Sequence, residues 1–600
     1  MVDNYRLAVN RRIPKLIQCI QLNAQHSRAA TSNLIQLISA NNIDLAFIQE
    51  PYVINHQLAG IPKTFKTFTH GNGRKRSAII VNNREMDTKM INQLSDADCV
   101  VVEVSLQKFK FYAVSKYCDS TEDMDKDTRE LDIIINFTKG KRLLIAADTN
   151  ARSHMWFDTQ TNPRGRKLEE FLTTSNLFIN NEDNGVPTIE TARGKSSVDL
   201  TISNSTLVRH IKEWKSGEEE SCADHKIITF LIETYNSRTF PDTTQQTNGL
   251  IKYIVSKNHY PEFDSNLIDN ITNNFHLAKN DDPKKLDEEL STNIINKMGT
   301  EDLITELFSC IKSACNSSFR ISTSKKKPSK GRTVPWWNDH LTIHRKKVNA
   351  MRRRYQRTQN NENLRLQRKA QYTEEKRLYQ SHIQQEKTKS WKQFCSTSSS
   401  NPWNAAYKIS TGKTRSQSIL STIKKINGTY TEDMESTLEY MLDYFVPDDS
   451  HESDTEYQKE IRSYSLEPSE QNDDRIFAKE EVLAVIKKFN PKKTPGEDGI
   501  SSDILLRVFE LFPSSITKMY NECLVKGYFP KIWKKTVIIP ITKPGKDRSL
   551  EVSKYRPISL INVAGKVLEK LLIDRILHKI YANSLMNSNQ YGFTPQRGTV

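Results

Sequence analysis

The first 235 residues predict a mixed α/β domain, and three observations in the sequence carry this prediction. Short apolar runs recur between turn-forming residues, which is typical of buried strands. Stretches with apolar residues at helical spacing lie between these runs and predict helices that cover a sheet. Six segments stop at, or are led by, a residue that can hold a metal ion or a phosphate. We therefore expect an α/β domain with polar side chains gathered at its strand ends.

The expected elements follow one another from residue 16 to residue 233. The strand-like runs are LIQCIQL (16–22), DLAFIQ (44–49), SAIIVNN (77–83), CVVVEVSL (99–106), FYAVSK (111–116), RLLIAA (142–147), SSV (196–198) and DHKIITFLIE (224–233). Helices are expected over residues 29–40, 122–137 and 165–176, where apolar residues recur every three or four positions.

Polar residues mark one end of six of these runs. They are Asn23, Glu50, Tyr117, Asp148 with Asn150 two residues on, Asp199, and the Asp224–His225 pair. Because strands that end near one edge of a core bring their last residues together, we expect all of these side chains to line one cleft.

Phosphodiester hydrolysis is the chemistry that these residue types serve together. A water must be activated and the charge on the phosphate stabilised, and Mg²⁺, which prefers oxygen ligands, does much of this. Glu50 is the first candidate ligand, because it lies between a buried run and Pro51, and Asp224 is the second. Asp148 and Asn150, on one short turn, could orient and deprotonate the water.

The remaining residues of the set could act on the phosphate. His225 could present an imidazolium to a phosphate oxygen, with Asp199 as its partner. Tyr117 and Asn23 could add neutral donors. Each residue alone is weak evidence, because an Asn or Asp after a strand is usually a turn residue. The hypothesis rests on the whole set and its order.

Length and charge point to further domains and to a nucleic-acid partner. Six hundred residues are too many for one core, so two to four domains are expected. The formal charge is +16, and residues 325–392 alone hold twenty Lys/Arg against five Asp/Glu. A basic, solvated helix is the plain alternative, but aromatic residues that could stack on bases lie among or near these cations. They are Trp336, Trp337, Tyr355, Tyr372, Trp391 and Trp403.

Composition divides the chain into five consecutive segments. We expect the α/β domain over residues 1–235, a linker and helical segment over 236–324, a basic helical segment over 325–440, an acidic linker over 441–475, and a second organised domain over 476–600. No apolar run approaches the roughly 20 residues of a membrane helix. The eight scattered cysteines, without a CxxC pair, favour a reduced intracellular chain without a disulfide framework or zinc site.

The order of the polar residues at the ends of these runs resembles that of the endonuclease/exonuclease/phosphatase family, and most closely that of the endonucleases of insect-type non-LTR retrotransposons. The stretches that carry the resemblance, over about residues 15–233, are QLNAQHSR, LAFIQEPY, SKYCDS, AADTNARSHMW, GVPTIETARGKSSVDLTIS and CADHKIITF. The resemblance implies a two-sheet α/β sandwich flanked by helices. It also implies a role for each matched residue. Glu50 would bind Mg²⁺, with Mn²⁺ as an alternative, near Asn23 and Asp224. Asp148, oriented by Asn150, would handle the proton of the water or of the leaving group. Tyr117 and His225 would contact the phosphate, while Asp199 would hold His225 and Thr188 would line the site.

Two positions depart from the family pattern. Ala147 stands where a Gly usually precedes the Asp, and Ala223 stands where a Ser or Thr usually precedes Asp-His. The second departure removes one hydroxyl near the site and could slow the enzyme.

Residues 476–600 resemble the reverse transcriptase of the same elements. The blocks PKKTPGEDGI, IIPITKPGK, YRPISL and QYGFTPQRGT match its fingers in order, which implies a partial α+β fingers/palm region. Lys543 would end a strand and Arg556 would open a helix, and both could bind a nucleotide triphosphate, for which Arg offers a bidentate fork. The alternative is that both are ordinary surface cations. The family's palm carboxylates lie beyond the last block, so we expect a truncated polymerase that does not synthesise DNA.

Together these features predict a Mg²⁺-dependent endonuclease of a non-LTR retrotransposon. It would nick target DNA and leave a 3′-OH from which the element's RNA is copied. The expected partners are target DNA and element RNA, without a membrane or small-molecule cofactor, and the expected location is the nucleus after synthesis in the cytoplasm. An abasic-site repair nuclease, a small-molecule phosphatase of the same fold, and a decayed copy that only binds nucleic acid are the alternatives. The target sequence is not legible in loops such as residues 60–76.

Overall fold

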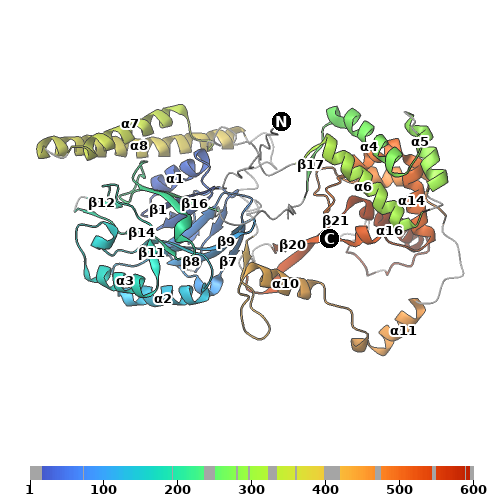
Figure 1. Cartoon of the computed structure of the whole chain (residues 1–600), viewed down its shortest axis with the longest axis horizontal. Coiled ribbons are helices and arrows are strands. Elements are labelled where there is room, and N and C mark those ends of the chain that lie inside the picture. The colour runs from blue at the N-terminus through green and yellow to red at the C-terminus, as the bar shows by residue number, and fades with distance from the viewer. Residues whose placement is uncertain are drawn as a thin grey trace, which may run out of the picture. The chain divides into compact units, whose positions relative to one another are not determined.

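The computed structural model describes residues 16–71, 73–191, 194–234, 251–278, 282–294, 298–321, 334–358, 361–397, 419–465, 475–543, 549–587, 589–592 and 594. They form two compact units, each made of segments that are not consecutive in the sequence (Figure 1). Unit 1 draws on Met1–Pro241, Lys326–Pro447 and Thr542–Tyr555, and unit 2 on Asp242–Lys325, Asp448–Ile541 and Arg556–Val600. This grouping differs from the five consecutive segments that composition suggested.

Two mixed sheets form the centre of unit 1. The first has six strands in the order β15 (Ile211–Ser216), β16 (Ile228–Glu233), β1 (Leu16–Asn23), β2 (Leu45–Gln49), β6 (Ser77–Val81) and β5 (Lys66–Phe68). The second has seven, in the order β11 (Leu177–Ile179), β14 (Asp199–Asn204), β10 (Leu143–Asp148), β9 (Phe109–Tyr117), β8 (Cys99–Leu106), β7 (Asp87–Met90) and β19 (Leu420–Ser421). Short two-stranded pairs β3 (Val53–Ile54) with β4 (Gln57–Leu58) and β12 (Ile189–Glu190) with β13 (Lys195–Ser196) extend from loops.

The predicted strands of the first 235 residues are present, but Asp199 lies at the start of its strand and not at the end. β1, β2, β9 and β10 end at or beside the expected polar residues. Asp199, by contrast, opens strand β14 instead of ending one, and β16 begins only at Ile228, after the Asp224–His225 pair. These two segments therefore reach the site from the opposite chain direction, through antiparallel pairing with β10 and β1.

The sandwich has four layers because each sheet is apolar on both faces. Ile17, Phe47 and Val102 belong to the core between the sheets. Helix α1 (Arg28–Ala40) covers the outer face of the first sheet, and α2 (Met124–Phe137) with α3 (Pro163–Thr174) covers the outer face of the second. All three predicted helices are confirmed within three residues at either end. Ser27, Asp123 and Asn162 accept backbone N–H groups at their first turns, which fixes where each helix begins.

The basic segment folds into a helical hairpin that packs on the two-sheet sandwich. Helices α7 (Asp339–Gln356) and α8 (Glu362–Thr397) lie over α1 (Figure 1). Their apolar side chains share one core with α1 and the outer face of the first sheet. The expected helical pair is therefore present, but it is part of unit 1 and not a separate segment. Residues 322–333 and 398–418 of the expected basic segment lie outside the described residues.

A later piece of chain completes the edge of the second sheet. β19 pairs parallel with β7, and helix α10 (Met434–Phe445) follows it. The buried Lys89 donates to the carbonyls of Thr431 at 3.1 Å and Asp433 at 2.9 Å. Edge strands expose unpaired N–H and C=O groups, so this cover protects β7. Part of the expected basic segment and of the acidic linker thus belongs to the sandwich.

Unit 2 is mainly helical. Its helices are α4 (Tyr260–Asn274), α5 (Pro283–Glu289), α6 (Thr300–Ser318), α11 (Glu456–Ser465), α12 (Lys479–Lys488), α13 (Ser502–Leu511), α14 (Pro513–Val525), α15 (Lys531–Lys534) and α16 (Val563–Ala582). Two short sheets accompany them: β17 (Tyr253–Ile254) pairs with β18 (Arg320–Ile321), and β20 (Thr536–Thr542) pairs with β21 (Tyr555–Ile561). One core joins residues 253–319 to residues 477–571. The helical part of the expected 236–324 segment is therefore packed against the C-terminal domain. In both units, none of the described helices has the length and apolar character needed to span a membrane.

Candidate active site

Three of the predicted residues lie in one row across the second sheet. Asp148 is the last residue of β10, and the register places it beside Tyr117 on β9 and Asp199 on β14. A one-residue slip would turn all three side chains to the other face of the sheet, so the register itself assembles this part of the site.

Asn23 reaches this row from the other sheet. Its Nδ2 donates to Asp148 Oδ2 at 2.7 Å, and its Oδ1 accepts the backbone N–H of Gln25 at 2.8 Å. Both Asn23 and Asp148 are buried. The two sheets therefore meet at this end through a hydrogen bond between predicted site residues.

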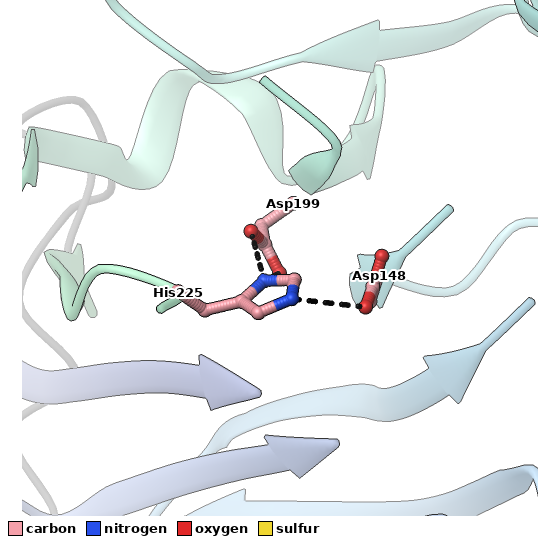
Figure 2. A group of neighbouring side chains, drawn as sticks. All are labelled: Asp148, Asp199 and His225. Atoms are coloured by element: carbon pink, nitrogen blue, oxygen red, sulfur yellow. Dashed lines mark hydrogen bonds and ion pairs between the residues drawn. The ribbon is translucent and has the colours of Figure 1, made fainter. Parts of the chain in front are cut away.

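His225 lies between two carboxylates (Figure 2). Its Nδ1 is 2.8 Å from Asp199 Oδ2, and its Nε2 is 3.9 Å from Asp148 Oδ2. Although burial lowers it, the charges of Asp199 and Asp148 raise the pKa of His225 to about 9. Burial, reinforced by the charge of Asp199, raises the pKa of Asp148 to about 7. At neutral pH the site therefore holds an imidazolium beside a carboxyl group that exchanges a proton readily.

Glu50 follows β2 in a left-handed backbone conformation. Its φ is +43°, a region that residues other than Gly adopt rarely. The carboxylate faces His26, with Oε1 3.4 Å from Nε2. Burial opposes the shift, but hydrogen bonds from His26 and Asn23 lower the pKa of Glu50. Glu50 is thus an ionised carboxylate next to Asn23, and its charge also acts on Tyr117 and His225.

Asn150 and Thr188 support the two aspartates. The backbone N–H of Asn150, whose φ is +46°, donates to Asp148 Oδ1 at 3.2 Å, and its side chain donates to the Cys118 carbonyl at 3.0 Å. The Thr188 hydroxyl accepts the N–H groups of Val198 at 3.0 Å and Asp199 at 3.1 Å. Thr188 therefore fixes the start of β14, and it also borders a cavity of about 260 Å³ next to Trp156 and Trp214.

Tyr117 and Asp224 complete the predicted set at its rim. Burial, together with the charge of Glu50, raises the pKa of Tyr117, so its hydroxyl stays protonated as a donor. The Arg76 guanidinium lies 5.1 Å from the centre of the Tyr117 ring. Asp224 is half-buried and contacts Gln25, whose Nε2 is 3.4 Å from Asp224 Oδ2.

Sequence reasoning missed a polar layer beneath the site. Gln21 Nε2 donates to the carbonyls of Ala147 at 3.2 Å and Leu200 at 3.4 Å. Gln49 Nε2 donates to the Ala146 carbonyl at 2.9 Å. Both glutamines are fully buried between the sheets. A signal was available, because a Gln in an otherwise apolar buried strand must find internal partners.

The oxygen donors around Glu50 fit a hard divalent cation such as Mg²⁺. Glu50 offers an ionised carboxylate, and the Asn23 amide that hydrogen-bonds to it also donates to the Asp148 carboxylate, so the two carboxylates lie on either side of Asn23. Ligand atoms of Asp148, Asp199 and His225 also lie within 4.8 Å of one another. Both Asp199 oxygens, however, are within 3.1 Å of His225 Nδ1. This trio therefore serves better as a hydrogen-bonded relay than as a shell of metal ligands.

The aromatic residues of the basic hairpin do not form the base-stacking surface that the sequence suggested. Trp337, Tyr355 and Tyr372 are buried against the sandwich, so the interpretation is wrong for them. Trp336 is half-buried, Trp391 is exposed, and Trp403 lies outside the described residues. The exposed cations of the hairpin remain available to phosphates. They are Lys346, Arg353, Arg354, Arg357, Lys389 and Lys392, whereas the exposed Lys347 and Arg377 pair with Glu375 and Glu374.

The two predicted nucleotide-binding cations of the C-terminal domain are placed differently from expectation. Lys543 directly follows β20, as expected, and its Nζ donates to the Ser553 carbonyl at 2.8 Å. Arg556 lies inside strand β21 and is exposed, so the expectation that it opens a helix is wrong. The helix that follows, α16, begins at Val563. Pro557 explains the shift, because it fixes an extended backbone at the residue before it.

The central stretch of the sandwich matches a known family. Residues 111–229, which contain Tyr117, Asp148, Asp199 and His225, match the family model described as "Endonuclease-reverse transcriptase". Among solved structures, the endonuclease domain of TRAS1, a telomere-specific non-LTR retrotransposon, is 26% identical, with a TM-score of 0.35; the match covers 37% of this chain and 100% of that one.

Three curated proteins are similar over longer or more conserved stretches. The putative 115 kDa protein in type-1 retrotransposable element R1DM of Drosophila melanogaster is 26% identical over 577 residues, which are 93% of this chain and 52% of that protein. The Pol polyprotein from element R1 of Bradysia coprophila is 24% identical over 561 residues, 90% of this chain and 52% of that protein. The RNA-directed DNA polymerase from mobile element jockey of Drosophila funebris is 40% identical over 124 residues, 20% of this chain and 13% of that protein. The chain thus spans about half the length of the first two.

Proposed function

Because this chain belongs to the endonuclease–reverse transcriptase proteins of non-LTR retrotransposons, we propose that unit 1 is a Mg²⁺-dependent endonuclease that nicks target DNA. The nick would leave a 3′-OH from which the element's RNA is copied. The observation that carries the proposal is the line Asp199–His225–Asp148, joined through Asn23 to the carboxylate of Glu50.

The relay assigns one task to each buried group. Asp199 orients His225, whose imidazolium Nε2 then donates to a non-bridging phosphate oxygen. Asp148 accepts a proton from the attacking water, for which a pKa of about 7 is well matched. The water oxygen bonds to phosphorus, the bond from phosphorus to the 3′-oxygen breaks with its electron pair on that oxygen, and the resulting alkoxide takes a proton from solvent water to become the 3′-hydroxyl.

Five neighbouring residues hold the reacting groups in place. Asn23 and the Asn150 amide each bond to one oxygen of Asp148, which fixes the direction of the carboxyl group. Tyr117, protonated at all neutral pH values, donates to the phosphate. Glu50, with Asn23 and Asp224, would hold the Mg²⁺ ion. When bound, that ion supplies charge stabilisation for the phosphate and the leaving oxygen.

The basic hairpin supports a polynucleotide substrate. Its exposed cations lie on the same unit as the relay, and Lys195, Arg365 and Lys369 surround the Tyr355 ring within 6.0 Å of its centre. A DNA backbone supplies the phosphates that such cations neutralise, and the same surface can hold the element's RNA.

Plasmid nicking by the 600-residue chain tests the proposal. We expect Mg²⁺-dependent conversion of supercoiled to nicked plasmid, and nicks that a DNA polymerase extends without prior phosphatase treatment. Glu50→Ala should abolish nicking, whereas Glu170→Gln, an exposed carboxylate on α3, should leave it unchanged. Wild-type nicking by Glu50→Ala would overturn the site assignment.

A further inference from the structure

The segment that leads into His225 has no regular secondary structure, and the sandwich holds it at two points: Asn33 of α1 donates to the Glu220 carbonyl at 2.5 Å, and the Asp224 N–H donates to Gln25 Oε1 at 2.8 Å. Residues 218–223 precede Asp224 and His225, form no helix or strand, and contain Cys222 in the left-handed conformation with φ of +63°. Within this segment the Ser221 hydroxyl bonds to the carbonyl of Ala223 at 3.1 Å. A loop of this kind holds a reacting group only if other parts of the fold fix its backbone.

The helical hairpin supplies donors to four carbonyls of this segment. Arg352 of α7, itself fully buried, donates to the carbonyls of Glu219 and Glu218, both at 2.6 Å. From α8, Gln380 donates to the Cys222 carbonyl at 2.9 Å. Lys376, also on α8, donates to the carbonyl of Ala223 at 2.7 Å. The last of these carbonyls belongs to the residue directly before Asp224.

A buried carboxylate anchors the middle of the segment to the same helix. Glu220 is 1% exposed, and its Oε2 accepts the Tyr372 hydroxyl at 2.6 Å. Lys376 Nζ lies 3.8 Å from its other oxygen. Burial opposes ionisation, yet Lys376, Arg352 and Tyr372 lower the pKa of Glu220, so it is a charged group. A buried charge is tolerated only when it is paired and hydrogen-bonded, so these partners hold Glu220 firmly.

A second set of contacts, through strand β12, holds the backbone of Asp224 and His225. Tyr355 of α7 donates to Glu190 Oε1 at 2.5 Å. The backbone N–H of Glu190 in turn donates to the Asp224 carbonyl at 3.1 Å, and Ile189 forms a β-bridge with His225. The hairpin thus holds the residues before Asp224 directly and those around His225 through β12.

We propose that hairpin α7–α8 is a positioning element of the nuclease, in which Arg352, Tyr372, Lys376 and Gln380 fix the backbone that places His225. The inference rests on the proposed function of the site. It goes further because it assigns residues far outside the resemblance to the geometry of the reaction. A displacement of about 1 Å in a reacting group can cost on the order of 10²-fold in rate, so small losses of support are measurable.

Tyr372→Phe in the 600-residue chain tests the proposal. The change removes one hydroxyl and keeps the ring, so the apolar packing of α8 is retained. We expect the single-turnover nicking rate constant to fall by about 10-fold, with the dissociation constant for DNA unchanged. The matched control is Tyr112→Phe, a buried tyrosine on β9 whose hydroxyl contacts Lys141 at 3.4 Å.

The split between rate and affinity separates positioning from mere stabilisation. If the loop shifts, the chemical step slows while DNA still binds, because the cations that face the phosphates are unchanged. Tyr112→Phe should leave both the rate constant and the dissociation constant at their wild-type values. A fall in rate that only follows a smaller folded fraction, measured by circular dichroism, would overturn the inference, as would a wild-type rate.

Two further variants keep the result interpretable. Gln380→Met removes only the donor to the Cys222 carbonyl and should reproduce the fall in rate more weakly, even if Tyr372→Phe fails to fold. A wild-type rate for Gln380→Met would count against the proposal. Glu50→Ala distinguishes the proposed site from the positioning role. If it nicks normally, the proposed site fails; if it is inactive while the hairpin variants are normal, only the positioning role fails.

Discussion

Asn23 and Asp148 lie on different sheets, and the 2.7 Å hydrogen bond between their side chains joins the two halves of the sandwich at the site. Asn23 ends a strand of the first sheet and Asp148 ends a strand of the second. Because both are buried, the bond is made in a low-dielectric setting, where it is strong and its loss is costly. The relative position of the sheets is therefore coupled to the orientation of the proton acceptor.

Removal of this bond should change the pH dependence of nicking. The Asn23 donor lowers the pKa of Asp148, so Asn23→Ala should raise that pKa further. Asp148 acts in its ionised form, and the acid limb of the rate profile should therefore move to higher pH. We expect a fall in rate of about 10- to 100-fold at pH 7, consistent with the loss of a hydrogen bond to a charged group. Asn136→Ala, an exposed position on α2, is the control; an unmoved acid limb would contradict the prediction.

The wild-type rate profile should be bell-shaped. The ionised Asp148 and the protonated His225 are needed together, so the rate should rise as pH passes about 7 and fall as it passes about 9. These values belong to the coupled pair, because each group acts on the other. Asp199→Asn removes the main charge that raises the pKa of His225. It should move the alkaline limb to lower pH and slow nicking by on the order of 10²-fold or more. A profile that is flat from pH 6 to 10 would refute this relay.

Binding of nucleic acid should depend on salt through the hairpin. Replacing the exposed Arg353 and Arg354 by Gln should weaken binding of duplex DNA and lower the slope of log K against log salt by about 0.9 for each phosphate that is no longer neutralised. The matched control is Lys284 and Lys285 replaced by Gln, two cations on α5 in the other unit. Fluorescence anisotropy between about 50 and 200 mM salt measures both slopes. Equal slopes for the two double variants would exclude the hairpin as the binding surface.

Lys89 should fasten the chain after residue 419 to the sandwich. Burial lowers the pKa of Lys89 to about 8, which shows how far its ammonium is removed from water. Lys89→Met removes both of its bonds to the carbonyls of Thr431 and Asp433. Limited proteolysis should then cut between residues 419 and 446 several times faster than in the wild type. The exposed Lys139→Met should leave the rate of cleavage unchanged.

The positions of the candidate site residues were predictable because local patterns determine them. Apolar runs that stop at polar residues located Asn23, Glu50, Tyr117 and Asp148 at strand ends, and periodicity located the helices. The partners of Glu220 were not predictable, because Arg352, Tyr372 and Lys376 lie more than 130 residues away and read as part of a charged, solvated helix. Charge counts within the hairpin were misleading for the same reason, because three carboxylates of the sandwich, Glu190, Glu219 and Glu220, face the hairpin.

The position of the hairpin in the sequence determines when, during synthesis of the chain, the loop before His225 receives its support. A growing chain that has reached residue 235 already holds every residue of the proposed relay, but not Arg352, Lys376 or Gln380, which donate to the carbonyls of Glu218, Glu219, Cys222 and Ala223. Those donors are added only after residues 251–321, which fold into the other unit, have been made. A chain still being synthesised would therefore lack this part of the support around His225 until Gln380 has emerged from the ribosome, and we expect slower DNA cutting before that point.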